Sequence, residues 1–144
     1  MLDTSPLTAA VERFADRLRA APQSRLQQGA AEVALDLARE LSLRAQRLEA
    51  ASAGSGDGRD GAGAAPARTM PDAGIFVVGD QLAVAGLDLA EALYAASAGA
   101  AGAVGSPGAT DAQDAPGRDV AKAPSEMLDE AVRLVDQAEA GALR

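Results

Sequence analysis

Apolar residues in the first 49 positions recur at helical spacing in two separate runs. The first run has members three or four residues apart, as expected for one buried face of a helix: Leu7, Val11, Phe14 and Leu18. Pro22 ends this helix, because a proline disfavours helical geometry in the residue before it. The second run has the same spacing: Leu26, Ala30, Val33, Leu37, Leu41 and Leu48. The short connection predicts an antiparallel helical hairpin of direct neighbours over residues 1–49.

Two leucines of the second run do not follow its stripe. Leu35 and Leu43 fall on the far side of the predicted helix. Two exposed leucines are normal on a soluble protein and need no function. The alternative is a second contact surface, for a partner or for another copy of the chain.

The segment 72–96 is predicted to be a helix that is apolar on two sides. One face holds five large side chains: Ile75, Val78, Leu82, Leu89 and Leu93. Nearly opposite are four more: Val77, Val84, Leu87 and Tyr94. A helix of this kind either lies at the centre of a bundle or contributes to an intermolecular interface. We therefore name the second face as a candidate partner interface, together with Leu35 and Leu43.

Small residues recur along the same segment, namely Gly79, Ala83, Gly86 and Ala90. Glycine in a helix destabilises it relative to alanine, so the close approach of another helix is a plausible compensation. A short strand at 75–78 is an alternative, because β-branched residues cluster there. A lone strand would have no partner, however, which favours the helix.

The rest of the chain divides into one helix and two linkers. Residues 124–144 are predicted to form an acidic amphipathic helix, whose stripe runs through Leu128, Ala131, Val132, Val135 and Ala138. Residues 50–71 and 97–123 are rich in Ala, Gly and Pro without an apolar period, which is typical of flexible, disordered linkers. The predicted fold is therefore all-α, a small four-helix bundle with two linkers.

Composition and charge exclude several classes of site and partner. The 144 residues contain no His, Cys or Trp, which removes thiol chemistry, disulfides and His-based triads. The net charge is −8, and residues 72–96 carry four acids and no base. Phosphate backbones would be repelled there, so nucleic-acid binding is disfavoured as a main role. Asp80, Asp88 and Glu91 interrupt the most apolar stretch, which argues against a membrane span.

Apparent catalytic and cofactor motifs have simpler explanations. Residues 56–61 match G-x-G-x-x-G, but a glycine tract surrounds them where a nucleotide site needs a strand before and a helix after. Asp57 and Asp60 lack the acidic spacing of a calcium loop. Carboxylate pairs such as Asp36 with Glu40 are typical of solvated helix faces. We predict no enzyme activity, no cofactor, no metal site and no catalytic residue.

Three stretches resemble small actinobacterial helical proteins of the ParJ type: 2–14 (LDTSPLTAAVERF), 71–74 (PDAG) and 78–82 (VGDQL). Proteins of that type interact with the chromosome-partitioning ATPase ParA and restrain its polymerisation. The resemblance covers about half of the chain and implies a regulator of a ParA-like ATPase. It assigns no residue a role.

The residues together favour a non-enzymatic, cytoplasmic, helical interaction or regulatory protein. Its partner would be another protein or a second copy of itself, bound through apolar helix faces. One alternative is the ParA-like regulator that the resemblance implies. Another is a nucleic-acid-associated protein, in which Arg13, Arg17 and Arg39 form a patch.

Overall fold

The computed structural model describes residues 2–54, 66–102 and 122–143. Within these ranges the chain forms four long helices and two short helical segments, and none of the described residues is in a strand. The elements are α1 (Ser5–Ala20), α2 (Gln23–Arg25), the π-helical turn η1 (Leu26–Ala30), α3 (Ala31–Gly54), α4 (Val78–Gly102) and α5 (Pro124–Ala142). The predicted all-α fold is confirmed.

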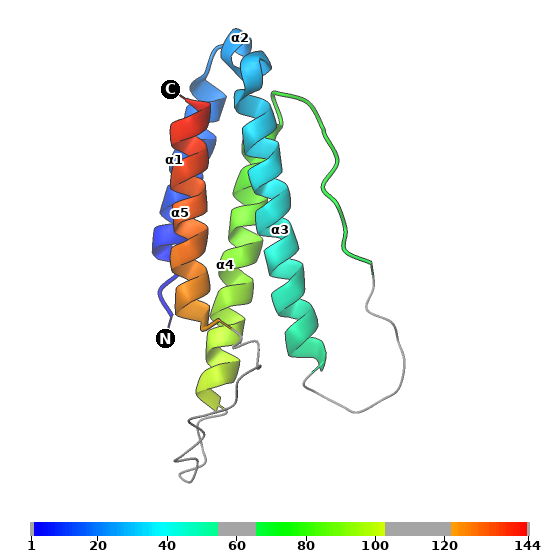
Figure 1. The fold of residues 1–144 in the computed structure, drawn as a ribbon, viewed down its shortest axis with the longest axis vertical. Coiled ribbons are helices and arrows are strands. Elements are labelled where there is room, and N and C mark those ends of the chain that lie inside the picture. Colours follow the sequence, from blue (N-terminus) through cyan, green and yellow to red (C-terminus); the bar gives the residue numbers. More distant parts are fainter. Residues whose placement is uncertain (1, 55–65, 103–121, 144) are drawn as a thin grey trace, which may run out of the picture.

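The four long helices are arranged up, down, down and up in chain order, so that α3 and α4 run parallel and α1 runs parallel to α5 (Figure 1). α4 packs most extensively on α3 and next on α1, while α5 packs on α1, α3 and α4. The backbones of α1 and α3 hardly approach one another. The two helices are antiparallel, as predicted, but they occupy opposite corners of the bundle instead of adjacent ones.

The predicted second helix is bent near its start. Gly29, inside η1, adopts a φ of 127° and a ψ of −12°, which interrupts the helical geometry two residues before α3 begins. Glycine tolerates this region because it has no Cβ. The apolar stripe continues across the bend, since both Leu26 and Ala30 are buried. Periodicity alone therefore predicted one straight helix where the structure has a bend.

The core lies on the bundle axis and is built from aliphatic side chains with one aromatic, Phe14. The largest fully buried side chains come from four helices: Leu7, Val11, Phe14, Leu18, Leu41, Leu82, Leu89, Leu93 and Val135. Many of the other core positions are alanines, such as Ala34, Ala38 and Ala85. Small core residues allow the helices to pack closely with few large side chains.

Helix α1 packs closely against the small residues of α4. A Cβ built on Gly86 would lie 2.6 Å from Cγ1 of Val11, and one built on Gly79 would lie 3.2 Å from the carbonyl oxygen of Ala15. Contacts under 3.0 Å require atoms to move, so position 86 has no room for a side chain. The predicted close approach of a helix to this row is confirmed.

Helix α4 begins later than predicted. Asp72 Oδ1 accepts a hydrogen bond from the Gly74 backbone N–H (2.9 Å), and Val77 N–H donates to the Gly74 carbonyl (3.2 Å). Gly74 itself has a φ of 103°. These bonds close a turn over residues 75–77 immediately before the helix. The alternative of a strand at 75–78 is therefore wrong.

The predicted linkers are partly ordered. α3 continues to Gly54 and α4 to Gly102, so residues 50–54 and 97–102 are helical. Residues 66–74 run beside α3, where the Gln46 side chain exchanges two hydrogen bonds with the Arg68 backbone (2.7 and 2.9 Å). Arg39 Nε donates to the Met70 carbonyl oxygen (3.0 Å). The linker expectation for 55–65 and 103–121 lies outside the described residues.

Candidate functional site

Four of the six residues predicted as a partner interface share an exposed face of α4 and the turn before it. Val77, Val84, Leu87 and Tyr94 are 40%, 54%, 49% and 42% exposed. Together with Phe76, which is 73% exposed, they are all the exposed large apolar side chains among the described residues. We call the α4 part of this set, Val84, Leu87 and Tyr94, the α4 patch.

The opposite face of α4 is part of the core. Val78, Leu82, Leu89 and Leu93 are each at most 2% exposed. The two apolar faces predicted from the sequence therefore have different environments. α4 buries one face against α1, α3 and α5, and it leaves the other on the surface of the bundle.

Leu35 and Leu43 do not belong to this surface. Leu35 is only 8% exposed and forms part of the core, and Leu43 is partly buried. Leu35 lines a cavity together with Ile75 and Val78, residues that follow the extended segment beside α3. Assigning Leu35 to an exposed interface was wrong, because a segment about 40 residues away in sequence covers it.

A groove lies between the start of α1 and the middle of α4, with a volume of about 310 Å³. Its lining combines two threonines at the start of α1 with residues of α4: Thr4, Thr8, Leu87, Ala90, Glu91 and Tyr94. Thr8 Oγ1 donates to the Thr4 carbonyl oxygen (3.4 Å). The groove thus has an apolar side on α4 and a hydroxyl-bearing side on α1.

One acidic side chain lines this groove, and others are exposed on the same two helices. Glu91 is part of the groove lining, while Asp80 and Asp88 are exposed elsewhere on α4. On α1, Glu12 and Asp16 follow Thr8 at spacings of four residues, so these three side chains form one row along the helix. Thr8 is at the groove, and the row therefore runs along the α1 edge that faces α4.

The cation at this edge is Arg19, which is shared between two of the acids. Its Nη2 lies 2.6 Å from Asp80 Oδ1, and its Nη1 lies 2.9 Å from Asp16 Oδ1. The hydrogen bond to Asp80, followed by that to Asp16, raises the pKa of the Arg19 guanidinium above its ordinary value. Three acids, Glu12, Asp88 and Glu91, remain around the α4 patch with no ion pair to an arginine or lysine of the described chain.

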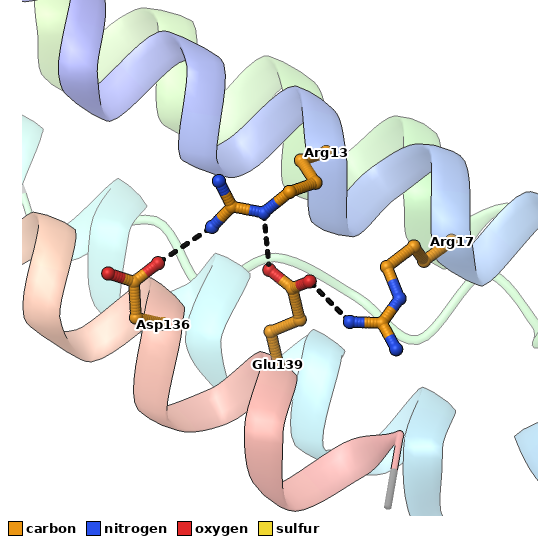
Figure 2. A network of polar contacts seen from close by, with 4 residues as sticks. All are labelled: Arg13, Arg17, Asp136 and Glu139. Atoms are coloured by element: carbon orange, nitrogen blue, oxygen red, sulfur yellow. Dashed lines mark hydrogen bonds and ion pairs between the residues drawn. The ribbon is translucent and has the colours of Figure 1, made fainter.

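A network of ion pairs joins α1 to α5 (Figure 2). It was not predicted from the sequence. Glu139 is 6% exposed, and among the described residues no other charged side chain is buried. Its carboxylate accepts hydrogen bonds from Arg13 Nε (3.1 Å) and Arg17 Nη1 (2.5 Å), and Arg13 Nη2 also donates to Asp136 (2.8 Å). The bond to Glu139 is the main reason that the pKa of Arg13 is raised.

A signal for this cluster does exist in the sequence. Glu139 stands four residues after Val135 on the apolar stripe of α5, and Arg13 and Arg17 are four residues apart on α1.

The arginine patch predicted for a nucleic-acid-associated protein is not formed. Arg13 and Arg17 face acids of α5, while Arg39 on α3 donates to Met70. These three arginines do not come together as one patch.

Two further cavities are lined by ion pairs. One, of about 490 Å³, lies at the Gly29 bend and includes Leu35 and Arg39. The other, of about 310 Å³, includes Leu48, Leu89 and Glu130, and Glu130 is bonded to both Arg44 and Lys122.

Within residues 2–54, 66–102 and 122–143, no three His, Cys, Asp or Glu side chains are grouped as a metal site would require. The G-x-G-x-x-G match at 56–61 lies outside the described residues.

α4 also has the length and composition of a membrane-spanning helix. Val78–Ala100 has a mean hydropathy of 1.2, and 39% of that window is buried inside the bundle. It is the one helix of this kind in the described parts of the chain. The core helix of a soluble protein has the same properties, so length and composition do not separate the two cases.

Comparisons with known proteins add no relative: no family model, curated protein or solved structure matches the chain. The resemblance of the N-terminal and central stretches to proteins of the ParJ type therefore stays a prediction.

Proposed function

We propose that this chain is a non-enzymatic, cytoplasmic interaction or regulatory protein that binds another protein through the exposed face of α4. The observation that carries the proposal is the placement of apolar surface. The exposed large apolar side chains of the described chain all lie between Phe76 and Tyr94, and three of them form the α4 patch. Such residues are scattered singly on most surfaces, whereas a contiguous group favours an interaction site.

The geometry of the patch supports the same conclusion. Val84 and Leu87 are half exposed on a helix whose other face is firmly held in the core by Leu82 and Leu89. A rigid helix that presents apolar side chains is typical of helix-mediated recognition, since little conformational entropy is lost on binding. The cytoplasmic location is part of the proposal, in which α4 serves as a core helix of the bundle and not as a membrane anchor.

A photo-crosslinking amino acid placed at Leu87 tests this function in the cells that naturally contain the protein. We expect a discrete covalent adduct of defined mass from position 87. The matched control is the same amino acid at Asp129, which is exposed on α5. Adducts of equal yield from both positions, or none from either, would refute the proposal.

A further inference from the structure

The α4 patch and its acidic surroundings also indicate the class of partner. We propose that the groove between α1 and α4 binds a basic amphipathic helix of another protein. This inference rests on the function proposed above and adds the chemistry of the partner to it.

The spacing of the patch fits a helix as occupant. Leu87 and Tyr94 line the groove, and Val84 is exposed one turn before Leu87. The three side chains span about three turns of α4, and the row from Asp80 to Tyr94 is about 20 Å long at 1.5 Å per residue. Peptide helices bind in such grooves through apolar residues spaced three, four and seven positions apart. A partner helix of about four turns would cover the whole row.

The charges around the patch select a basic occupant. Glu91 in the groove lining, Asp88 next to Leu87 on α4 and Glu12 on α1 form no ion pair with an arginine or lysine of the described chain. Arg19 does not offset them, because its guanidinium is already shared by Asp16 and Asp80. A helix with Lys or Arg beside its apolar stripe would place opposite charge against these acids, which favours both encounter and register.

The same charges disfavour two other occupants. A second copy that paired α4 with α4 would bring Asp88 and Glu91 of both copies into one interface, and α4 has no base to meet them. Like charges across an interface are destabilising. An anionic membrane surface attracts helices rich in Lys and Arg, and this face carries the opposite charge.

Two synthetic 18-residue peptides would test the proposal by fluorescence anisotropy with the intact protein. Both carry leucine at the same three-, four- and seven-residue spacing, and their polar positions are all Lys in one and all Glu in the other. We expect the Lys peptide to bind at least tenfold more tightly than the Glu peptide, with affinity that falls as salt rises. Equal binding of the two peptides would overturn the choice of a basic partner.

Variants separate the apolar and the charged contributions. L87S should abolish binding of the Lys peptide, and the double variant D88N/E91Q should weaken it by about fivefold, as expected for the loss of two exposed ion pairs. The control, E126Q/D129N on α5, removes two exposed acids elsewhere and should leave the affinity unchanged. If the control weakens binding as much as D88N/E91Q does, net charge alone explains the result and the site is refuted. V84S provides a second apolar variant in case L87S fails to fold.

Sedimentation of the same proteins distinguishes the remaining cases. A dimer that forms with rising concentration and is lost in L87S would show that a second copy covers the patch. That result would refute the basic partner and leave the function of α4 as a contact surface intact. If neither peptide binds and the protein stays monomeric, but the Leu87 crosslink still forms in cells, the partner has other chemistry and only this inference fails. Loss of all three signals would refute the proposed function as well.

Discussion

Gly86 of α4 lies directly against the side chain of Val11 of α1, and a Cβ at position 86 would be 2.6 Å from Cγ1 and 2.8 Å from Cγ2 of that valine. Val11 is 1% exposed and β-branched, so it has little freedom to move away. The contact therefore sets how closely α1 and α4 approach, and it also positions the groove that the two helices form.

Gly86→Ala should destabilise the bundle even though alanine is the better helix former. The helix propensity gained is about 0.5–1 kcal/mol, whereas overpacking a core typically costs about 1–3 kcal/mol. We expect the free energy of unfolding, measured by urea denaturation, to fall by about 1 kcal/mol, the difference between the midpoints of those two ranges.

Gly99→Ala is the matched control on the same helix, because a Cβ at Gly99 would meet no atom within 4 Å. This change should raise stability by about 0.5–1 kcal/mol. Val11→Ala should restore much of the loss when combined with Gly86→Ala. If Gly86→Ala is as stabilising as Gly99→Ala, the two helices do not pack as described.

Leu35 and Leu87 provide a test of which leucines are core residues. Leu35 is 8% exposed and Leu87 is 49% exposed. Leu35→Ala should lower the free energy of unfolding by about 2–4 kcal/mol, as expected for a buried leucine. Leu87→Ala should change it by no more than about 0.5 kcal/mol. Similar losses from both variants, in the same denaturation experiment, would mean that Leu87 is packed in the fold as Leu35 is.

This pair also shows what periodicity along one helix can and cannot predict. The spacing of Val84 and Leu87 against Leu82 and Leu89 assigned the two faces of α4 correctly, because both faces are properties of one helix. Leu35 lies beside residues 72–78, with which it lines a cavity, and no pattern within α3 encodes the path of that segment. The same reasoning applies to α1 and α3, whose stripes predicted burial but not that they occupy opposite corners.

The Glu139 cluster escaped prediction for a related reason. An acid on the buried stripe of α5 conflicts with apolar periodicity, and it is compatible with burial only because Arg13 and Arg17 reach it from α1. The distance between these residues in the sequence exceeds 120 positions. Only the packing of α1 beside α5 reveals that the three side chains meet.

Gly29→Ala should destabilise the protein through backbone strain alone. A Cβ at Gly29 would meet no atom within 4 Å, but the φ of 127° is one that side chains rarely adopt. We expect a loss of about 1–3 kcal/mol in the free energy of unfolding. Gly141→Ala on α5 is the control, since that site is equally open and has no positive φ. Equal stability of the two variants would show that the bend is absent in solution.

Glu139→Gln tests how α5 is held to α1. The substitution keeps the shape of the side chain and removes the charge that two arginines share, so we expect a loss of about 1–3 kcal/mol. Asp136→Asn removes a carboxylate that is 52% exposed and bonds Arg13 only, so it should cost less than about 1 kcal/mol. Thermal unfolding followed by circular dichroism would rank the two variants, and the reverse order would contradict the described burial.

Glu130 should make the docking of α5 sensitive to acid. Its pKa is lowered chiefly by the hydrogen bond from Lys122 Nζ (2.6 Å) and then by the one from Arg44 (3.1 Å). A lowered pKa in the folded state means that folding favours the charged carboxylate. The stabilisation is therefore complete above the unfolded pKa of about 4.3 and is lost as pH falls through the lower folded value.

The measurement is the difference in Tm between the parent protein and Glu130→Gln, taken from pH 8 down to pH 3. We expect a constant difference at neutral pH that shrinks below about pH 4.3, because the parent's Glu130 then becomes neutral as well. Asp129→Asn removes the adjacent exposed carboxylate and controls for the change in net charge. A difference that persists unchanged at pH 3 would mean that Glu130 acts through its shape and not through its charge.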